Sequence, residues 1–163
     1  MSVAALIPVE QYLNTSYSPD CEYVDGAVVE RNVGELPHSL VQRKFIVWLS
    51  RNCPVLQVWP ELRVQVSPSR FRVPDVCVTQ SVPGTDVLHT PPLIVLEILS
   101  KDDSLSALQE RIDDYLAFGV PHVWIVDPRR RVGYACEPSA IRKVAAFEVA
   151  HPSIQLPVES LFD

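Results

Sequence analysis

Long apolar runs, clustered cysteines and glycine-rich loops are all missing from this sequence. No apolar run approaches the roughly 20 residues of a membrane-spanning helix, so we predict no membrane partner. The four cysteines are widely scattered and form no CxxC pair, which argues against a zinc site and favours free thiols in a reducing compartment. With 5 glycines there is no phosphate-cradling loop, and no nucleophile-elbow motif occurs. Nucleotide-cofactor binding and acyl transfer are therefore poor fits.

An excess of basic residues is missing as well, because the 163 residues carry a formal net charge of −6. Nucleic-acid binding domains usually have more Lys and Arg than Asp and Glu. Because this chain is acidic overall, any contact to phosphate must come from a local basic patch. The opening MSVAALIPVEQYL has neither the basic segment nor the long apolar segment of a signal peptide, and we expect a cytoplasmic protein. The composition, with 47% hydrophobic and 21% charged residues, predicts a single globular domain over residues 1–163.

The stretch from Pro91 to Pro128 predicts a strand, a helix and a second strand. Leu93–Leu99 is too apolar for a surface strand and predicts one that is buried on both faces. A helix follows to about Phe118, and His122–Val126 predicts the second buried strand. This order is a βαβ unit, whose crossover should be right-handed. Four residues offer N-caps for the helix: Asp102, Asp103, Ser104 and Ser106.

Shorter patterns predict the remaining elements. The dipeptide Asp25-Gly26 lies between two β-prone runs and predicts a hairpin. A long helix is expected over Pro37–Asn52. Three single strands are expected, over Val55–Val66, Phe71–Thr79 and Ile154–Leu156. Pro74 places an edge or a bulge in the second strand, and a helical turn follows the third. An antiparallel pair is expected between Val132–Cys136 and Lys143–Ala150.

Two acids lie within the β-prone runs. With the period of two along a strand, Asp75 shares a face with Cys77, and Glu97 shares a face with Val95. If the two strands are neighbours in one sheet, both carboxylates can converge on a hard cation, which prefers oxygen ligands. A structural interpretation stands beside this one, in which Asp75 is a turn acid and Glu97 is the buried partner of an ion pair.

Three further side chains could join these acids. Arg111 lies on the flank of the predicted helix and can reach the strand that bears Glu97, or it can pair with Asp114 or that same glutamate. His38 opens the long helix, where it is either solvated or part of the site. Glu61 either joins the site or pairs with Arg63 or Lys44. The buried stripe of the helix is predicted as Leu105, Leu108, Ile112, Tyr115 and Leu116.

Three segments carry a resemblance: RVPDV at 72–76, PPLIVLEILS at 91–100 and ERIDDYLAFGVPHVWIVDP at 110–128. Together they resemble the Uma-type restriction endonucleases, a family of the PD-(D/E)xK nuclease superfamily. The resemblance extends to the hairpin around Asp25-Gly26, to His38 and to the terminal LPVESLF, so it covers nearly the whole chain. The spacing of the segments is more specific than any one of them.

The resemblance implies an α/β fold with a restriction-endonuclease-like core, in which helices flank a central mixed β-sheet with one βαβ crossover. It implies that Asp75 and Glu97 hold Mg²⁺, or Mn²⁺ in its place. We also consider His38, Glu61 and Tyr115 as accessory residues of this site. The parent superfamily places a lysine two residues after the second acid, where this chain has Leu99. The Uma-type pattern moves this lysine into the helix, where this chain has Arg111, and favours an aspartate where this chain has Ala107. These two departures from the family pattern bear on whether the site can catalyse turnover, and they leave the expected fold unchanged.

The first hypothesis is a Mg²⁺-dependent endodeoxyribonuclease that hydrolyses DNA phosphodiester bonds, with Asp75, Glu97 and Arg111 as catalytic residues. The second is a catalytically weak or inactive relative that binds DNA or a protein partner. Duplex DNA is the expected substrate, and cleavage of both strands suggests a homodimer. The expected phosphate contacts are Arg43, Lys44, Arg70, Arg72 and Lys101. The basic turn Arg129–Arg131 is expected to lie too far along the chain to contact the DNA phosphates.

Overall fold

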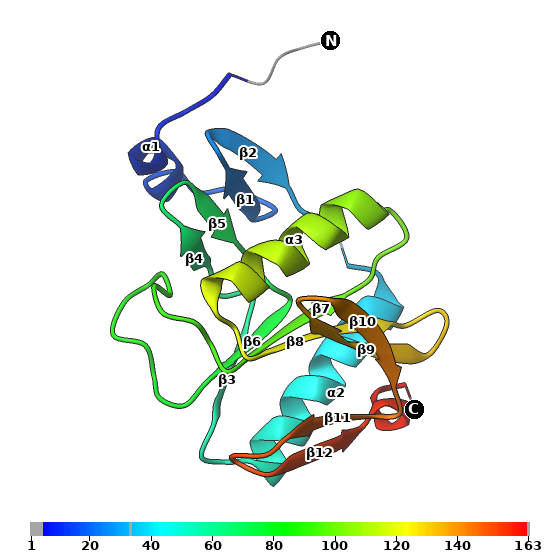
Figure 1. The fold of residues 1–163 in the computed structure, drawn as a ribbon. Helices are drawn as coiled ribbons and strands as arrows, with labels where there is room; N and C mark the ends of the chain where they lie inside the picture. Colours follow the sequence, from blue (N-terminus) through cyan, green and yellow to red (C-terminus); the bar gives the residue numbers. More distant parts are fainter. Residues whose placement is uncertain (1–4, 33, 163) are drawn as a thin grey trace.

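The computed structural model describes residues 5–32 and 34–162 (Figure 1). A six-stranded sheet lies at its centre, in the order β10-β9-β8-β7-β6-β3. Strands β7 and β8 pair in parallel and the other neighbours are antiparallel, so the sheet is mixed. Its strands are β3 (Gln57–Pro60), β6 (Val76–Thr79), β7 (Ile94–Ile98), β8 (His122–Asp127), β9 (Val132–Glu137) and β10 (Ala140–Val144).

Two long helices cover opposite faces of this sheet, α2 (Leu36–Asn52) on one and α3 (Leu105–Phe118) on the other (Figure 1). Alternate residues of β7 follow this division, since Ile94 and Leu96 pack into the core beneath α2 and Val95 packs beneath α3. The connection β7-α3-β8 joins two parallel neighbours, which confirms the predicted βαβ unit. The prediction of a mixed central sheet flanked by helices is therefore confirmed.

A second sheet and a short pair complete the fold. The second sheet has the order β2-β1-β5-β4 and contains the predicted hairpin at Asp25-Gly26. None of the helices in the described part of the chain combines the length and apolarity needed to span a bilayer. The remaining elements are α1 (Val9–Leu13), β1 (Cys21–Val24), β2 (Ala27–Glu30), β4 (Val64–Ser67), β5 (Arg70–Arg72), β11 (Ala146–Val149), β12 (Ile154–Pro157) and the 3₁₀ turn η1 (Val158–Leu161).

Three strands predicted as continuous are each divided. Val55–Val66 forms β3 and β4, which lie in different sheets, and Glu61 between them has a φ of +52°. Phe71–Thr79 forms β5 and β6, again in different sheets, because Pro74 has no N–H for a strand ladder. Lys143–Ala150 is divided between β10 and β11, and only β10 pairs with β9. The chain thus crosses between sheets beside Asp75.

Helix α3 has well-defined ends. The Ser104 side chain accepts a hydrogen bond from the N–H of Ala107, so Ser104 is the N-cap among the predicted candidates. Gly119 ends the helix with a φ of +101°, which favours glycine. Leu105 was predicted in the buried stripe, but it is 87% exposed because it lies in the first turn, beyond the edge of the sheet that Leu108 covers.

Candidate active site

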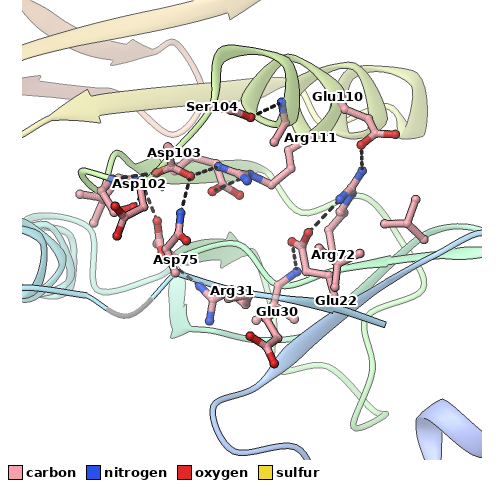
Figure 2. A pocket seen from close by; sticks show the side chains of 18 of the residues that line it. Glu22, Glu30, Arg31, Arg72, Asp75, Asp102, Asp103, Ser104, Glu110 and Arg111 are labelled. Atoms are coloured by element: carbon pink, nitrogen blue, oxygen red, sulfur yellow. Dashed lines mark hydrogen bonds and ion pairs between the residues drawn. The ribbon is translucent and has the colours of Figure 1, made fainter. Parts of the chain in front are cut away.

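A cavity of about 260 Å³ lies between the second sheet, the end of β7 and the first turns of α3 (Figure 2). Asp75 and Glu97 line it, and each is only 5% exposed. The antiparallel register pairs Val76 with Leu96, and Asp75 and Glu97 adjoin the two members of this pair. Glu97 contacts Tyr115 and Arg111 of α3, whereas Asp75 contacts Arg31 and His38. The structure thus brings together the two acids that the sequence singled out.

Protein donors satisfy both oxygens of Asp75. Oδ2 accepts a hydrogen bond of 2.7 Å from the backbone N–H of Ile98. Oδ1 lies 2.9 Å from Nη2 of Arg31 and 3.1 Å from Nε2 of His38. The carboxylate is therefore fixed by a backbone amide on one side and by the guanidinium of Arg31 and the imidazole of His38 on the other.

Glu97 has a different environment. Its Oε1 accepts a hydrogen bond of 2.7 Å from the Tyr115 hydroxyl, and its Oε2 lies 3.3 Å from Nε of Arg111. Burial raises the pKa of Glu97 to about 8; Arg111 acts against this, and the negative charges of Asp75 and Glu22 add to it. Without a further cation, this carboxyl group holds its proton to a higher pH than an ordinary glutamate.

Arg111 spans two acids from its place on α3. Its Nη2 lies 3.1 Å from Oδ1 of Asp103, while its buried Nε faces Glu97 without forming a hydrogen bond. Burial lowers the pKa of Arg111, but the charges of Glu97, Glu22 and Asp103 outweigh burial and raise it. The guanidinium remains charged, so Arg111 can stabilise an anion but cannot act as a base.

Two of the predicted accessory residues reach the acids directly. Tyr115 is fully buried and donates to Glu97, and His38 contacts Asp75. A side chain at Gly34 would place its Cβ 2.9 Å from the His38 ring, so this glycine leaves room for the imidazole. Burial lowers the pKa of His38, but the hydrogen bond and charge of Asp75 outweigh burial, so the pKa of His38 lies above its ordinary value. Glu61 is exposed and stands 3.5 Å from Arg31, rather than pairing with Arg63 or Lys44.

Sequence reasoning missed Arg31, Glu22 and Asp103. Arg31 pairs with Asp75 across 44 residues, and Glu22 contacts both Arg72 and the N–H of Val73. Asp103 was considered only as a helix cap. The contacts of Arg31 and Glu22 join segments that are distant in the sequence, so no local pattern indicated them, whereas Asp103 contacts Arg111 only eight residues along the chain. The one available signal was charge within a β-prone run, which Glu22 shares with Asp75 and Glu97.

The predicted basic contacts lie in different places. Arg43 is exposed and Lys44 half-buried on α2, and Lys101 is exposed beside a small hollow, where it pairs with Glu35. Arg70 is held by Asp25 and Asp114. Arg72 is buried, lines the cavity and pairs with Glu22 and Asp114, and its predicted contact to phosphate stays a prediction.

The basic turn lies closer to the site than expected. Arg129 and Lys101 both pair with Glu35, and they line a small hollow together with His38. His38 also lines the main cavity. The prediction that this turn is too distant is therefore wrong for Arg129, because β8 runs parallel to β7 and brings the two strand ends to one edge of the sheet.

The buried pair of Arg72 and Glu22 gives a stability prediction. Arg72→Met is expected to lower the free energy of unfolding by about 3 kcal/mol, because Glu22 would then be buried without its cation. Urea unfolding followed by circular dichroism measures the change. The control is Arg142→Met, which removes an exposed pair with Glu137 and should cost far less, because solvent screens exposed ion pairs. Equal effects of the two substitutions would contradict the prediction.

Asp103 gives a pH prediction. Burial raises the pKa of Asp103, but the Ser100 N–H and Arg111 outweigh burial and hold it below the ordinary value. A lowered pKa means that the carboxylate stabilises the fold above about pH 3.9, and that this stabilisation is lost as the pH falls through the lowered pKa. Asp103→Asn should cost about 1 kcal/mol at pH 7, and this difference should vanish in acid. A difference that is constant between pH 7 and pH 3 in urea unfolding would contradict this account.

The donor set of Asp75 and Glu97 fits a hard cation. Mg²⁺ is usually held by one or two carboxylates and takes its other ligands from water and from substrate phosphate. Within residues 5–32 and 34–162, no group of three or more His, Cys, Asp or Glu side chains is placed to hold a metal ion. A cation held by these two carboxylates alone would have to take its other ligands from water or substrate.

The mixed sheet, the helices on its two faces and the acid pair beside α3 define a nuclease-like α/β domain. A crystal structure from Anabaena variabilis ATCC 29413, described as a putative nuclease belonging to DUF820, has the same fold with a TM-score of 0.83. The alignment covers 96% of this chain and 97% of that chain at 20% identity.

Residues 9–158 match the Uma2 family, described as "Putative restriction endonuclease", and the chain belongs to this family. The resemblance predicted from the three segments is thereby confirmed. No curated protein matches the chain.

Proposed function

We propose that the protein is a Mg²⁺-dependent endodeoxyribonuclease that hydrolyses the phosphodiester bonds of DNA. The observation that carries the proposal is the acid pair of Asp75 and Glu97, buried in a cavity that guanidinium groups also line. Carboxylates with open cation coordination and fixed positive charges are the parts that phosphoryl transfer requires. Membership of the Uma2 family and the nuclease-like fold support the same class of reaction.

Asp75 and Glu97 would hold the metal, and Mn²⁺ could replace Mg²⁺. When bound, such an ion would lower the pKa of a water molecule and neutralise charge on the scissile phosphate. The Ile98 N–H fixes Asp75, and the Tyr115 hydroxyl fixes Glu97, so the two carboxylates keep their orientation. Arg111 stands beside Glu97 and can donate to a phosphoryl oxygen where negative charge builds up.

A second candidate function is a DNA- or protein-binding module without turnover. One observation favours it: Arg31 pairs with Asp75 at 2.9 Å, and Arg111 lies 3.3 Å from Glu97. Arg111 also stands where the resemblance places a lysine. A site whose acids are satisfied by arginines can keep its fold and its affinity for phosphate without binding a cation.

The deciding experiment is a cleavage assay on supercoiled plasmid and on single-stranded oligonucleotides. We expect nicking or linearisation of the plasmid with Mg²⁺ or Mn²⁺, none with EDTA, and none by Asp75→Asn. Because duplex cleavage on both strands needs two sites, we also propose a homodimer, and sedimentation in the presence of DNA measures it. Cleavage that persists in Asp75→Asn, or no cleavage with either metal, would overturn the nuclease proposal.

The proposed DNA contact surface is the basic rim made by Lys101 and Arg129 beside the cavity, with Arg43 and Lys44 on α2. If about four phosphates are contacted, duplex affinity should fall on the order of 10²-fold between 50 and 200 mM salt, because counterions are released on binding. Fluorescence anisotropy measures the salt slope. The double change Lys101→Ala and Arg129→Ala should reduce that slope by about two, whereas Arg142→Ala should leave it unchanged. Binding that is independent of salt would exclude this surface.

A further inference from the structure

Arg31 is the cavity residue that the proposed reaction leaves unexplained. It follows directly after β2, and its side chain is 16% exposed. Its Nη2 lies 2.9 Å from Oδ1 of Asp75 (Figure 2). Its Nη1 lies 3.5 Å from Oε1 of Glu61. Burial lowers the pKa of Arg31, but the charges of Asp75, Glu97 and Glu61 raise it, so the guanidinium stays charged.

The two oxygens of Asp75 are held in different ways. Oδ2 accepts from the N–H of Ile98, a backbone group at the end of a central strand that cannot withdraw without unpairing β7. Oδ1 is contacted by Arg31 and His38, which reach it through side chains. A cation that binds Asp75 therefore meets a carboxylate that is fixed on one side and exchangeable on the other.

Charge decides what happens at the exchangeable oxygen. A metal ion lies about 2.1 Å from a ligand oxygen, so a cation on Oδ1 would be within a few ångströms of the Arg31 guanidinium. Two positive charges at that distance repel strongly in a buried cavity. Arg31 can leave because it is a long side chain at the end of β2, an edge strand that pairs only with β1 in the described residues. Arg111 is held more firmly, because Asp103 anchors it on α3.

We infer that Arg31 is a displaceable counter-ion of Asp75. In the metal-free protein it neutralises and orients the carboxylate, and a divalent cation must displace it. The released guanidinium remains in the same cavity and can then bind a phosphate oxygen of DNA. This inference rests on the proposed function and adds a competition between Arg31 and the metal ion for Asp75. DNA and metal should therefore each strengthen the binding of the other, because a DNA phosphate draws Arg31 away from Asp75.

The test measures metal affinity without cleavage. Mn²⁺ is titrated calorimetrically into wild type, Arg31→Gln and the control Arg142→Gln, which loses an exposed guanidinium remote from the cavity. Arg31→Gln keeps a hydrogen-bond donor near Oδ1 and removes the charge. We expect it to bind Mn²⁺ about tenfold more tightly than wild type, and the control to match wild type. In metal-free buffer Arg31→Gln should melt at a lower temperature than wild type, and saturating Mn²⁺ should close the gap.

Duplex affinity with Ca²⁺ present supplies the second readout, and Arg31→Gln should weaken it while Arg142→Gln leaves it unchanged. Arg31→Lys keeps the positive charge but loses the planar guanidinium, and it should give an intermediate Mn²⁺ affinity. It replaces Arg31→Gln in the titration if the glutamine variant does not fold. Mn²⁺ binding by wild type with the same affinity in both Arg31 variants would overturn the inference and leave the nuclease proposal standing. Mn²⁺ binding only after Arg31→Gln, abolished by adding Asp75→Asn, would support it. Absence of Mn²⁺ binding in every variant would overturn the inference and the metal-dependent function together.

Discussion

Replacing Glu97 by glutamine is expected to lower metal-dependent DNA cleavage by at least about 10³-fold. Glutamine keeps the shape and can still accept from Tyr115, but it removes one of the two charges that would hold the cation. Initial rates of plasmid nicking at saturating Mg²⁺ measure the loss. Glu110→Gln is the matched control, because Glu110 lines the same cavity but is half-exposed and pairs with Arg70 and Arg72. Its effect should be no more than a few-fold.

The pH dependence of metal binding gives an independent view of Glu97. Burial holds the pKa of this carboxyl group at about 8, so a cation must displace a proton when it binds at neutral pH. Mn²⁺ affinity should therefore weaken as the pH falls below about 8 and level off above it. Titrations in buffers of different ionisation enthalpy count the protons released. Proton release that is unchanged in Glu97→Gln would assign the titration to another group and would remove Glu97 from the metal site.

Local sequence patterns predicted the elements that carry the acid pair. The apolar run at 93–99 predicted β7, and the period of two placed Glu97 on one face of it. The convergence of Glu97 with Asp75 was conditional on their strands being neighbours, which the pairing of β6 with β7 now shows. The capped helix and the second buried strand followed from equally local signals, Ser104 and Gly119 at the ends of α3. Hydrophobic periodicity is strong where a segment is buried on both sides, which explains this success.

The divided strands could not be predicted in the same way. Val55–Val66 was predicted as one strand although Pro60 lies within it; β3 ends at Pro60, and Glu61 then adopts a positive φ and sends the chain into another sheet. The fate of Arg72 was hidden, because whether an arginine faces solvent or a buried acid depends on Glu22, 50 residues away. Arg31 went unnoticed for the same reason. Long-range charge pairing is a property of the assembled sheets and not of any local pattern.

Arg111→Lys is expected to raise cleavage by about tenfold over the native protein. In wild type, the Arg111 fork spans Glu97 and Asp103, so it competes with a cation for Oε2 of Glu97. A lysine is a compact charge that cannot bridge both acids, and it can hydrogen-bond an attacking water or a phosphoryl oxygen. The native protein should accordingly be a weak nuclease, and the gain should appear in single-turnover cleavage of duplex DNA with saturating enzyme.

Arg111→Ala completes this prediction from the opposite direction. It removes the positive charge beside Glu97, so cleavage should fall on the order of 10²-fold relative to wild type, as expected for the loss of one transition-state donor. Mn²⁺ affinity should persist or rise, because Asp75 and Glu97 both remain and their competitor is gone. The contrast between a gain with lysine and a loss with alanine separates a catalytic charge from a structural one, since both substitutions break the link to Asp103.

If Arg111→Lys is inert with Mg²⁺ and Mn²⁺, and Glu97→Gln alters neither metal affinity nor DNA binding, the cavity is not a nuclease site. The fixed pairing of Arg31 and Arg111 with the two acids would then mark the protein as a binding module.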